Sequence, residues 1–356
     1  MIKGAATPLF LCKEVVVFKS VYMAMLLSFS MLLTACSEDK MPVVHLQGET
    51  MGTTYNVKYV VPEGSEPQSD LKKKIDKRLN EINALMSTYD TGSELSRFNQ
   101  NRYTKPYPVS AETLTVVNEA LRLGEMSNNV LDVTVGPLVN LWGFGPNKRP
   151  ETVPTEQQIN DVRAYVGLDK ISTTDTALIK SHPMVYVDLS TIAKGYGVDQ
   201  VAAILEQQEI HNFLVEIGGE MRLKGHRGNG DEWLVAIEKP VTTERAVQKI
   251  LSVGTNAIAT SGDYRNYYEQ EGKRYSHLID PRTGKPITHN LVAVTVVSPS
   301  SMTADGLATA LIVMGWEEAR SLAEKEDLAV LLIRKTDDGF EEYVSPAFEQ
   351  VVDVRN

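Results

Sequence analysis

Cysteine is scarce in this chain. Its 356 residues include only Cys12 and Cys36, and both stand close to the N-terminus. The rest of the chain therefore has no thiol for a disulfide, for a thiolate metal site or for a cysteine nucleophile. With no cross-link available, packing, alone or together with a ligand, must hold a fold of this length together.

Several other common signatures are also missing. The six histidines include no His-x-x-x-His pair, and the sequence has neither a Gly-x-Ser-x-Gly elbow nor a Gly-x-x-x-x-Gly-Lys-Ser/Thr loop. Zinc hydrolases, serine hydrolases and P-loop nucleotidases are therefore poor fits. An excess of positive charge is lacking too, since the formal net charge is −10. This balance argues against nucleic acid and against a basic membrane-binding patch.

No hydrophobic run reaches the length of a membrane span. The run from Val21 to Leu33 follows Lys13 and Lys19 and ends in Leu33-Thr-Ala-Cys36. Such a start resembles a bacterial lipoprotein signal, although an ordinary signal peptide with a chance cysteine is the alternative. We predict a signal peptide over residues 1–35, lipidation of Cys36, a tether over 36–47, and a location on the periplasmic side of a bacterial membrane. The mature chain would carry 33 basic and 45 acidic residues, a net charge of −12.

The remaining pattern predicts an α+β fold with mainly antiparallel sheet, in a single domain over residues 48–350 with a central cleft. Apolar residues at helical spacing predict helices near 71–85, after Ser110, after Thr155, and over 303–314 and 317–325. Short apolar runs separated by turn residues predict strands at 51–60, 213–217, 221–224, 233–238, 250–253, 274–279, 291–298 and 328–334.

The stretch Asp188-Leu-Ser-Thr-Ile-Ala-Lys-Gly-Tyr-Gly-Val-Asp-Gln200 follows the apolar run Met184–Val187. Strand, glycine turn and helix in this order are typical of a phosphate-binding loop. Gln200, however, occupies the place of the third glycine of a dinucleotide fingerprint. The stretch is therefore either a nucleotide site of another kind or only the start of a helix.

Other stretches also allow two interpretations. Asp305 and Thr309 share a helix face, where the carboxylate either caps the helix or helps to bind a hard cation such as Mg²⁺. His277, before the turn at 280–284, is either structural or a proton acceptor. Gly218-Gly219 forms either a tight hairpin or a close approach to a ligand, and Thr260-Ser-Gly262 either a polar strand end or a ligand contact.

Taken in order, these stretches resemble the ApbE family of periplasmic FAD:protein FMN transferases. The resemblance rests on Met51-Gly-Thr-Thr-Tyr55, Met86-Ser-Thr-Tyr-Asp90, Ser93–Asn99, Asp132–Gly145, Asp188–Tyr196, Gly218-Gly219, Thr260-Ser-Gly262, His277–Pro281 and Ala304-Asp305. It implies a T-fold-like domain that splits FAD, passes FMN to a threonine or serine hydroxyl of a partner protein and releases AMP, with Mg²⁺ as cofactor. It also implies acceptors among the periplasmic flavin-bearing subunits of sodium-pumping quinone reductases or Rnf-type complexes.

The resemblance also implies roles for individual residues. The metal would be held by Thr191, Asp305 and Thr309. Lys194 would contact phosphate, and His277 would be the general base, with Asp280 as the alternative. The FAD pocket would be lined by Met51, Tyr89, Leu131, Asp132, Asp188 and Ile279.

Two residues depart from the family pattern, in which glycine is common at Thr191 and alanine at Gly306. A backbone carbonyl would serve at position 191 with either residue, and glycine inside a helix costs roughly 1 kcal/mol relative to alanine. Two other functions stay open. An FAD pyrophosphatase, which transfers FMN to water, would use the same motifs. A lipoprotein that holds flavin or another solute for delivery would need a cleft but no metal and no base.

Overall fold

The computed structural model describes residues 1, 40–145, 152–240, 247–263, 267–270 and 273–355. Cys36, the expected signal peptide and most of the expected tether lie outside these residues. From Met41 onward the chain forms one compact unit. In the described part of the chain, no helix combines the length and apolarity needed to cross a membrane.

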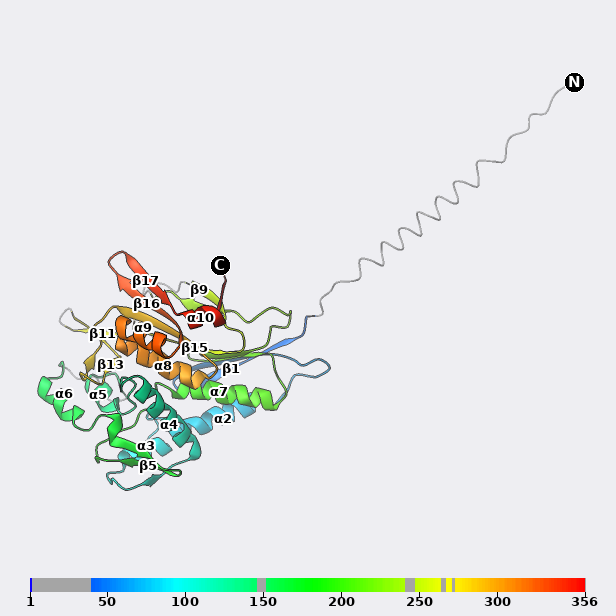
Figure 1. Ribbon diagram of the computed structural model, residues 1–356. Coiled ribbons are helices and arrows are strands. Elements are labelled where there is room, and N and C mark those ends of the chain that lie inside the picture. Colours follow the sequence, from blue (N-terminus) through cyan, green and yellow to red (C-terminus); the bar gives the residue numbers. More distant parts are fainter. Residues whose placement is uncertain (2–39, 146–151, 241–246, 264–266, 271–272, 356) are drawn as a thin grey trace. The chain divides into compact units, whose positions relative to one another are not determined.

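The centre of the fold is an eight-stranded sheet in the order β1-β2-β6-β7-β10-β15-β16-β17 (Figure 1). All of its neighbouring strands pair antiparallel, which confirms the predicted fold class. The strands are β1 (Val43–Thr50), β2 (Thr53–Val60), β6 (Phe213–Ile217), β7 (Glu220–Lys224), β10 (Ala257–Gly262), β15 (Leu291–Ser298), β16 (Ala329–Thr336) and β17 (Gly339–Val344).

Both faces of this sheet are covered, as β16 illustrates. Val330 and Leu332 belong to the hydrophobic cluster beneath the helices, whereas Leu331 and Ile333 belong to a second cluster on the opposite face. Successive side chains of a strand point to opposite faces, so a strand buried on both sides must be apolar throughout. The second cluster is closed by α10 and a three-stranded sheet, β18-β9-β8, whose elements are β8 (Val235–Glu238), β9 (Val247–Ser252), α10 (Pro346–Val351) and β18 (Asp353–Arg355).

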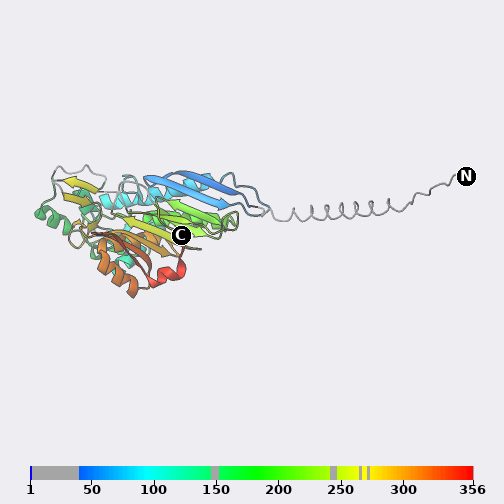
Figure 2. The ribbon, with the colours of Figure 1, turned by 90° about the horizontal axis from the view of Figure 1, so that it is seen from above.

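Helices cover the other face. Helix α7 packs against α2 and α8, and α8 also contacts α4, α9, β10 and β15 (Figures 1 and 2). The predicted helix starts are confirmed, since Ser110 and Thr155 accept hydrogen bonds from the first turns of α4 and α6. The helices are α2 (Leu71–Met86), α3 (Glu94–Gln100), α4 (Ala111–Met126), α5 (Gly136–Leu141), α6 (Glu156–Arg163), α7 (Ala193–Gln207), α8 (Ser301–Met314) and α9 (Trp316–Lys325).

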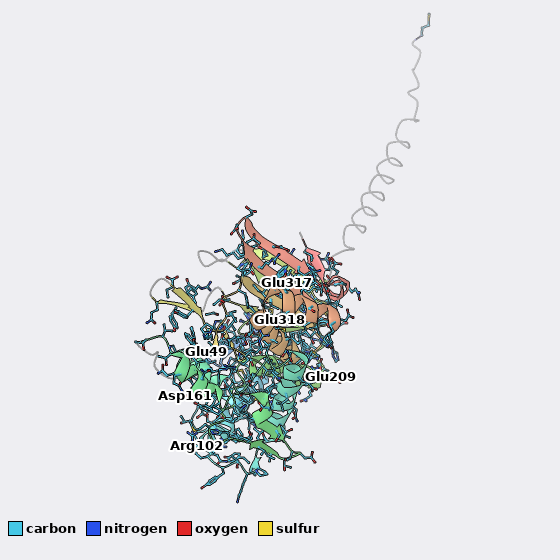
Figure 3. All side chains as sticks on the ribbon, turned by 60° about the vertical axis from the view of Figure 1, so that its left-hand side comes forward. Glu49, Arg102, Asp161, Glu209, Glu317 and Glu318 are labelled. Carbon is cyan, nitrogen blue, oxygen red and sulfur yellow. The ribbon has the colours of Figure 1, made fainter. Side chains whose placement is uncertain are left out.

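Smaller elements complete the domain. A three-stranded sheet in the order β3-β5-β4 adjoins a 3₁₀ turn, and the predicted strand at 274–279 is divided between two hairpins. These elements are β3 (Tyr107–Pro108), η1 (Leu168–Lys170), β4 (Ile171–Thr173), β5 (Ala177–Lys180), β11 (Tyr267–Gln270), β12 (Lys273–Ser276), β13 (Ile279–Asp280) and β14 (Lys285–Pro286). Charged side chains such as Glu49, Arg102, Asp161 and Glu317 lie exposed on the surface (Figure 3).

The expected domain boundaries at 47/48 and 350 differ from those of the structure. The first strand already begins at Val43, because residues 43–50 pair with β2, and β18 extends the fold to Arg355 by pairing with β9. The predicted strand at 51–60 also begins later, at Thr53. Met51 and Gly52 form the turn of the β1–β2 hairpin with φ values of 51° and 72°. Positive φ at both residues matches the twist of a two-residue hairpin turn.

The apolar run Met184–Val187 was expected to be a strand, and this is wrong. The run belongs to none of the described strands. The side-chain amide of Asn99 donates to the carbonyl of Val187 at 2.8 Å and accepts from its N–H at 2.8 Å. The N–H of Asp188 donates to the carbonyl of Val133 at 2.7 Å. These contacts replace a strand partner in satisfying the buried backbone.

One buried lysine gives a pH prediction for stability. Lys180 is 1% exposed, and its ammonium donates to the carbonyls of Phe98 at 3.1 Å and Val185 at 3.4 Å. Burial, followed by the nearby charge of Arg102, lowers the pKa of Lys180 to about 8. The unfolded chain therefore binds more protons between pH 8 and about 10.4, so the free energy of unfolding should increase as the pH rises through this range.

We expect this increase to be about 2 kcal/mol between pH 8 and 10. Urea unfolding at pH 8, 9 and 10 would measure it. In Lys180→Met the contribution should disappear, while the titration of all other groups remains the same in both proteins. An identical pH slope in the two proteins would contradict the assignment to Lys180.

Candidate functional site

A cavity of about 400 Å³ gathers side chains that are far apart in the sequence. It is lined by residues of the Leu131–Gly145 segment, the start of α7, the start of β7, the end of β10, the β12–β13 connection and the middle of α8. Ten predicted site residues lie here: Tyr89, Leu131, Asp132, Asp188, Thr191, Lys194, His277, Ile279, Asp305 and Thr309. Met51 lines a second cavity of about 760 Å³, which shares Tyr89, Asp188, Ser190 and Lys194 with the first.

The start of α8 shows whether Asp305 caps its own helix. The free N–H groups there are satisfied by other residues. The Ser300 hydroxyl accepts from the N–H of Thr303 at 3.3 Å, and the Asp199 carboxylate of α7 accepts from the N–H groups of Ser301 and Met302 at 3.0 and 3.1 Å. Asp305 is therefore not the cap of its helix. Its carboxylate is directed instead towards the start of α7 and the cavity.

Asp305 belongs to a buried ionic cluster with Lys194 and Glu220. The Lys194 ammonium lies 3.0 Å from a Glu220 carboxylate oxygen and 3.4 Å from an Asp305 oxygen. The N–H of Gly195 also donates to Asp305, at 3.0 Å. Asp305 is 3% exposed and Glu220 is 5% exposed. Two carboxylates and one ammonium are thus held together at the wall of the cavity with little solvent around them.

The charged groups of this cluster shift one another's pKa values. Burial disfavours the ammonium of Lys194, but the carboxylates of Asp305 and Glu220 outweigh burial and raise the pKa of Lys194 above its ordinary value. Burial, followed by the negative charge of Asp305, raises the pKa of Glu220 to about 8. Burial likewise raises the pKa of Asp305, against the opposing effect of Lys194. Two carboxylates close together in a buried site favour the binding of another positive charge.

Two oxygens beside the cluster have no hydrogen-bond partner among the described residues. They are the hydroxyl oxygen of Thr191 and the second carboxylate oxygen of Glu220, and both are buried. Both residues line the cavity, as does Thr309, which lies one helical turn after Asp305. A buried polar atom without a partner is costly, so these oxygens favour a ligand that brings positive charge or hydrogen-bond donors.

The other predicted residues form the sides of the two cavities. Burial raises the pKa of Asp132, although the N–H and hydroxyl of Thr134 donate to its carboxylate at 2.7 and 2.6 Å. Burial raises the pKa of Asp188 as well, and its carboxylate accepts from the N–H of Ser190 at 2.9 Å. Tyr89 is 71% exposed at the shared edge of the two cavities, where a planar ligand could stack on its ring.

His277 and its alternative Asp280 are placed differently. His277 lines the cavity and packs edge-on against Phe144, with ring centroids 6.4 Å apart. The carboxylate of Asp280 accepts from the guanidinium of Arg282 at 3.0 to 3.2 Å, and only its neighbours Ile279 and Pro281 are among the described residues that line the cavity. The geometry therefore favours His277 as the group that faces a reactant.

Comparison with known proteins decides the family. The model of the ApbE family matches residues 51–332 of this chain. The chain belongs to the ApbE family. The resemblance inferred from the sequence motifs is thereby confirmed.

Relatives in the ApbE family support the match over most of the chain. The FAD:protein FMN transferase of Vibrio cholerae is 55% identical over 320 residues, which cover 90% of this chain and 96% of the relative. The enzyme of that name from Haemophilus influenzae is 51% identical over 332 residues, covering 91% and 95%. The solved structure of the flavin transferase ApbE from Vibrio cholerae superimposes with a TM-score of 0.82 at 53% identity, covering 87% of this chain and 99% of that chain.

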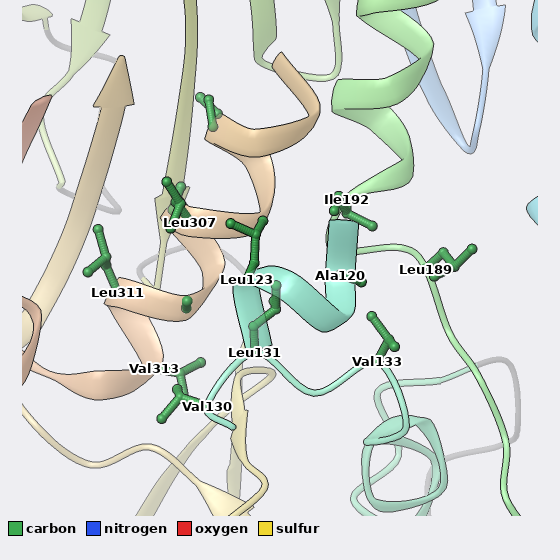
Figure 4. Packing of buried hydrophobic residues seen from close by; sticks show 14 of the residues in the cluster. Ala120, Leu123, Val130, Leu131, Val133, Leu189, Ile192, Leu307, Leu311 and Val313 are labelled. Atoms are coloured by element: carbon green, nitrogen blue, oxygen red, sulfur yellow. The ribbon is translucent and has the colours of Figure 1, made fainter. Parts of the chain in front are cut away.

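The two departures from the family pattern have local explanations. A Cβ at Gly306 would come within 2.6 Å of the Leu123 side chain. Leu123, Leu131 and Ile192 fill the space between α4, α7 and α8 (Figure 4), so the large side chains here take the room that an alanine would need. At position 191, the threonine hydroxyl is buried and has no hydrogen-bond partner among the residues that the structure describes.

Sequence patterns did not identify Glu220 and Asp199 as important residues. Glu220 follows Gly218 and Gly219, whose φ values of 60° and 109° turn the chain so that β7 begins beside the cavity. A carboxylate directly after a glycine turn was the available signal. Asp199 binds the start of α8 from α7 and also pairs with Arg222 at 3.0 Å, a role that depends on residues distant in the sequence.

Proposed function

We propose that this chain transfers FMN from FAD to a serine or threonine hydroxyl of a partner protein and releases AMP. One observation carries the proposal: Lys194, Asp305, Glu220 and the Thr191 hydroxyl meet at one cavity, which adjoins a second cavity with Met51 and Tyr89. Together the two cavities suit a ligand with a charged middle and a planar end. Relatives named as FAD:protein FMN transferases support the same reaction.

The donor set beside Lys194 fits a Mg²⁺ ion. Among the described residues no group of three or more histidine, cysteine or acidic side chains forms a metal site. Mg²⁺, however, usually takes only one or two carboxylates and fills its other positions with water and substrate phosphate. Asp305, Thr309 and Thr191 would hold the ion, and the free oxygen of Thr191 is the observation that supports this choice. When bound, Mg²⁺ would neutralise charge that develops on the phosphate oxygens.

In the proposed reaction, the hydroxyl oxygen of the acceptor attacks the phosphorus on the FMN side of the FAD pyrophosphate. A new P–O bond forms, the bond to the AMP phosphate breaks, and AMP carries the electron pair away. Lys194 holds the pyrophosphate by charge and hydrogen bonding. Its pairing with Glu220 and Asp305 keeps the ammonium at the cavity wall before the substrate arrives.

His277 is proposed to accept the proton that the acceptor hydroxyl loses. The ordinary pKa of histidine suits proton transfer near neutral pH, and His277 lines the same cavity as Lys194 and Asp305. The proposed FAD contacts are Met51, Tyr89, Leu131, Asp132, Asp188 and Ile279, which line one or both cavities.

The setting of the reaction follows from the N-terminal sequence. We propose a lipid anchor at Cys36 on the periplasmic side of a bacterial membrane, as the run Val21–Leu33 and Leu33-Thr-Ala-Cys36 suggest. The proposed acceptors are flavin-bearing periplasmic subunits of sodium-pumping quinone reductases or Rnf-type complexes.

Intact mass spectrometry of an acceptor subunit after incubation with the enzyme, FAD and Mg²⁺ tests the function. We expect the acceptor to gain the mass of one FMN, AMP to appear in equal amount, and a chelator to stop both.

His277→Asn should transfer more slowly and lose the dependence on pH near neutrality, because the proton acceptor is gone.

Three results would indicate another function. Free FMN and AMP without modified acceptor would support an FAD pyrophosphatase. Stoichiometric FAD binding without products would support a flavin-binding lipoprotein. No FAD binding at all would contradict every form of the proposal.

A further inference from the structure

Lys194 shares its ammonium between two carboxylates that come from different elements of the fold. The nitrogen lies 3.0 Å from Oε1 of Glu220 on β7 and 3.4 Å from Oδ1 of Asp305 on α8. Among the described residues that line the cavity of about 400 Å³, Lys194 is the only lysine or arginine. The proposed Mg²⁺ ion would need the same carboxylate of Asp305. The ammonium and the ion would therefore compete for Asp305.

The turn between β6 and β7 positions both the stem of Lys194 and the carboxylate that pairs with it. The N–H of Gly219 donates to the carboxylate of Glu216 at 2.8 Å, which fastens the turn. A Cβ on Gly218 would lie 3.4 Å from Cδ of Lys194, so the stem of the lysine passes close to this turn. Glu220 follows directly as the first residue of β7. The backbone of the turn thus determines where the ammonium meets Glu220.

Asp305 is held in place without Lys194. Its Oδ2 accepts from the N–H of Gly195 at 3.0 Å, and the carboxylate of Asp199 binds the start of α8. Its Oδ1 faces the ammonium of Lys194 and is the oxygen that can change its partner. A cation at Oδ1 would repel the ammonium, because like charges in a buried site interact strongly. Lys194 then needs another acceptor if it is to stay at the cavity wall.

Glu220 has the capacity to be that acceptor. It is 5% exposed, its Oε1 already pairs with Lys194, and its Oε2 is buried without a hydrogen-bond partner among the described residues. An ammonium has three N–H donors. The donor that Lys194 withdraws from Asp305 can turn to Oε2 of Glu220, which is otherwise unsatisfied. The charges also balance, since the ammonium neutralises one carboxylate and leaves the other for the ion.

We propose that Glu220 is a positioning residue that retains Lys194 when a divalent cation binds Asp305, and so keeps the Asp305 carboxylate available to the cation. This inference rests on the proposed function. Glu220 acts here through Lys194 and is not itself a ligand of the ion. The same contact keeps the ammonium where the proposed reaction needs it, beside the pyrophosphate.

Binding of Mn²⁺ to the full chain tests this role without a measurement of transfer. The electron paramagnetic resonance signal of free Mn²⁺ gives the Kd. Glu220→Gln should raise this Kd about 10-fold or more, since Lys194 would then pair with Asp305 alone. When Glu220→Gln is combined with Lys194→Met, the competing ammonium is gone and the cluster regains its wild-type net charge. The Kd of the double variant should return to within about 3-fold of the wild-type value.

Glu216→Gln is the matched control. It removes a carboxylate from the same turn, but Glu216 is not among the described residues that line the cavity. Its Kd for Mn²⁺ should equal that of the wild type, and thermal unfolding of every variant would check the fold.

Two results would overturn the proposal. The first is an equal Kd for Mn²⁺ in Glu220→Gln and in the wild type. The second is a double variant that binds Mn²⁺ as weakly as Glu220→Gln, because removal of Lys194 would not rescue the loss of a direct ligand or of a merely structural residue. If the wild type binds no Mn²⁺, with or without FAD, the metal site of the proposed function fails as well. If Mn²⁺ binding follows the expected pattern but no acceptor receives FMN, only the proposed function fails.

Discussion

Asp305→Asn should reduce the rate of FMN transfer about 1,000-fold or more, with FAD and Mg²⁺ at saturating concentrations for the wild-type enzyme. Asn keeps the shape of the side chain and an oxygen that can accept from the N–H of Gly195. It loses the negative charge that the proposed Mg²⁺ site needs and that balances the ammonium of Lys194. The rate of acceptor modification, measured by mass spectrometry over time, would test this expectation.

The fold should survive this change, because Lys194 retains its pairing with Glu220. Thermal unfolding would check this, and titration with Mn²⁺ would show whether cation binding is the property lost. Glu220→Gln serves as the comparison, since it removes the other carboxylate of the cluster but leaves Asp305 in place. Wild-type transfer by Asp305→Asn would show that the metal assignment is wrong.

Gly195→Ala should lower the free energy of unfolding by about 3 kcal/mol and strongly reduce transfer. A Cβ at Gly195 would come within 2.2 Å of the carbonyl oxygen of Ser301 and 2.8 Å of the Cα of Met302. Both are backbone atoms, so α7 and α8 would have to move apart. This movement would separate Lys194 and Gly195 on α7 from Asp305 on α8, and the cavity wall would lose its geometry.

Gly197→Ala is the matched control in the same helix. There the new Cβ would meet the side-chain ends of Met51 at 3.0 Å and Ile217 at 3.2 Å, which can shift. Replacing glycine by alanine in a helix gains about 1 kcal/mol, which offsets this crowding. Urea unfolding of both variants should therefore show a large loss for Gly195→Ala and little change for Gly197→Ala. Equal stability of the two variants would refute the close helix contact.

Local patterns predicted much of this fold. Helix α2 was found because its apolar residues repeat at helical spacing, and α4 because Ser110 supplies the cap of its first turn. The first residues of β1, 43–47, were included in the predicted tether although they alternate in burial as a half-buried strand does. The apolar run Met184–Val187 suggested a strand but does not form one. The side chain of Asn99, distant in the sequence, makes hydrogen bonds to the backbone of Val187 in place of a partner strand.

The site residues likewise include some that the sequence predicted and some that it did not. Asp188, Thr191 and Lys194 were predicted within one short stretch, and all three line the cavity. Asp305 offered two interpretations, and the contacts of Ser300 and Asp199, which lies far away in the sequence, show that it does not cap its own helix. Glu220 could not be predicted, because its partner Lys194 comes from another element and the burial of the pair is a property of the folded chain.

The length of the β1–β2 hairpin matters if the chain is anchored at Cys36, as proposed. Its turn, Met51-Gly52, lines the second cavity, whereas the chain enters the fold at the opposite end of β1. Eight residues of strand separate these two points, a distance of about 25 Å. In a molecule attached by its N-terminus, the length of β1 would thus separate the second cavity from the point where the chain enters the fold.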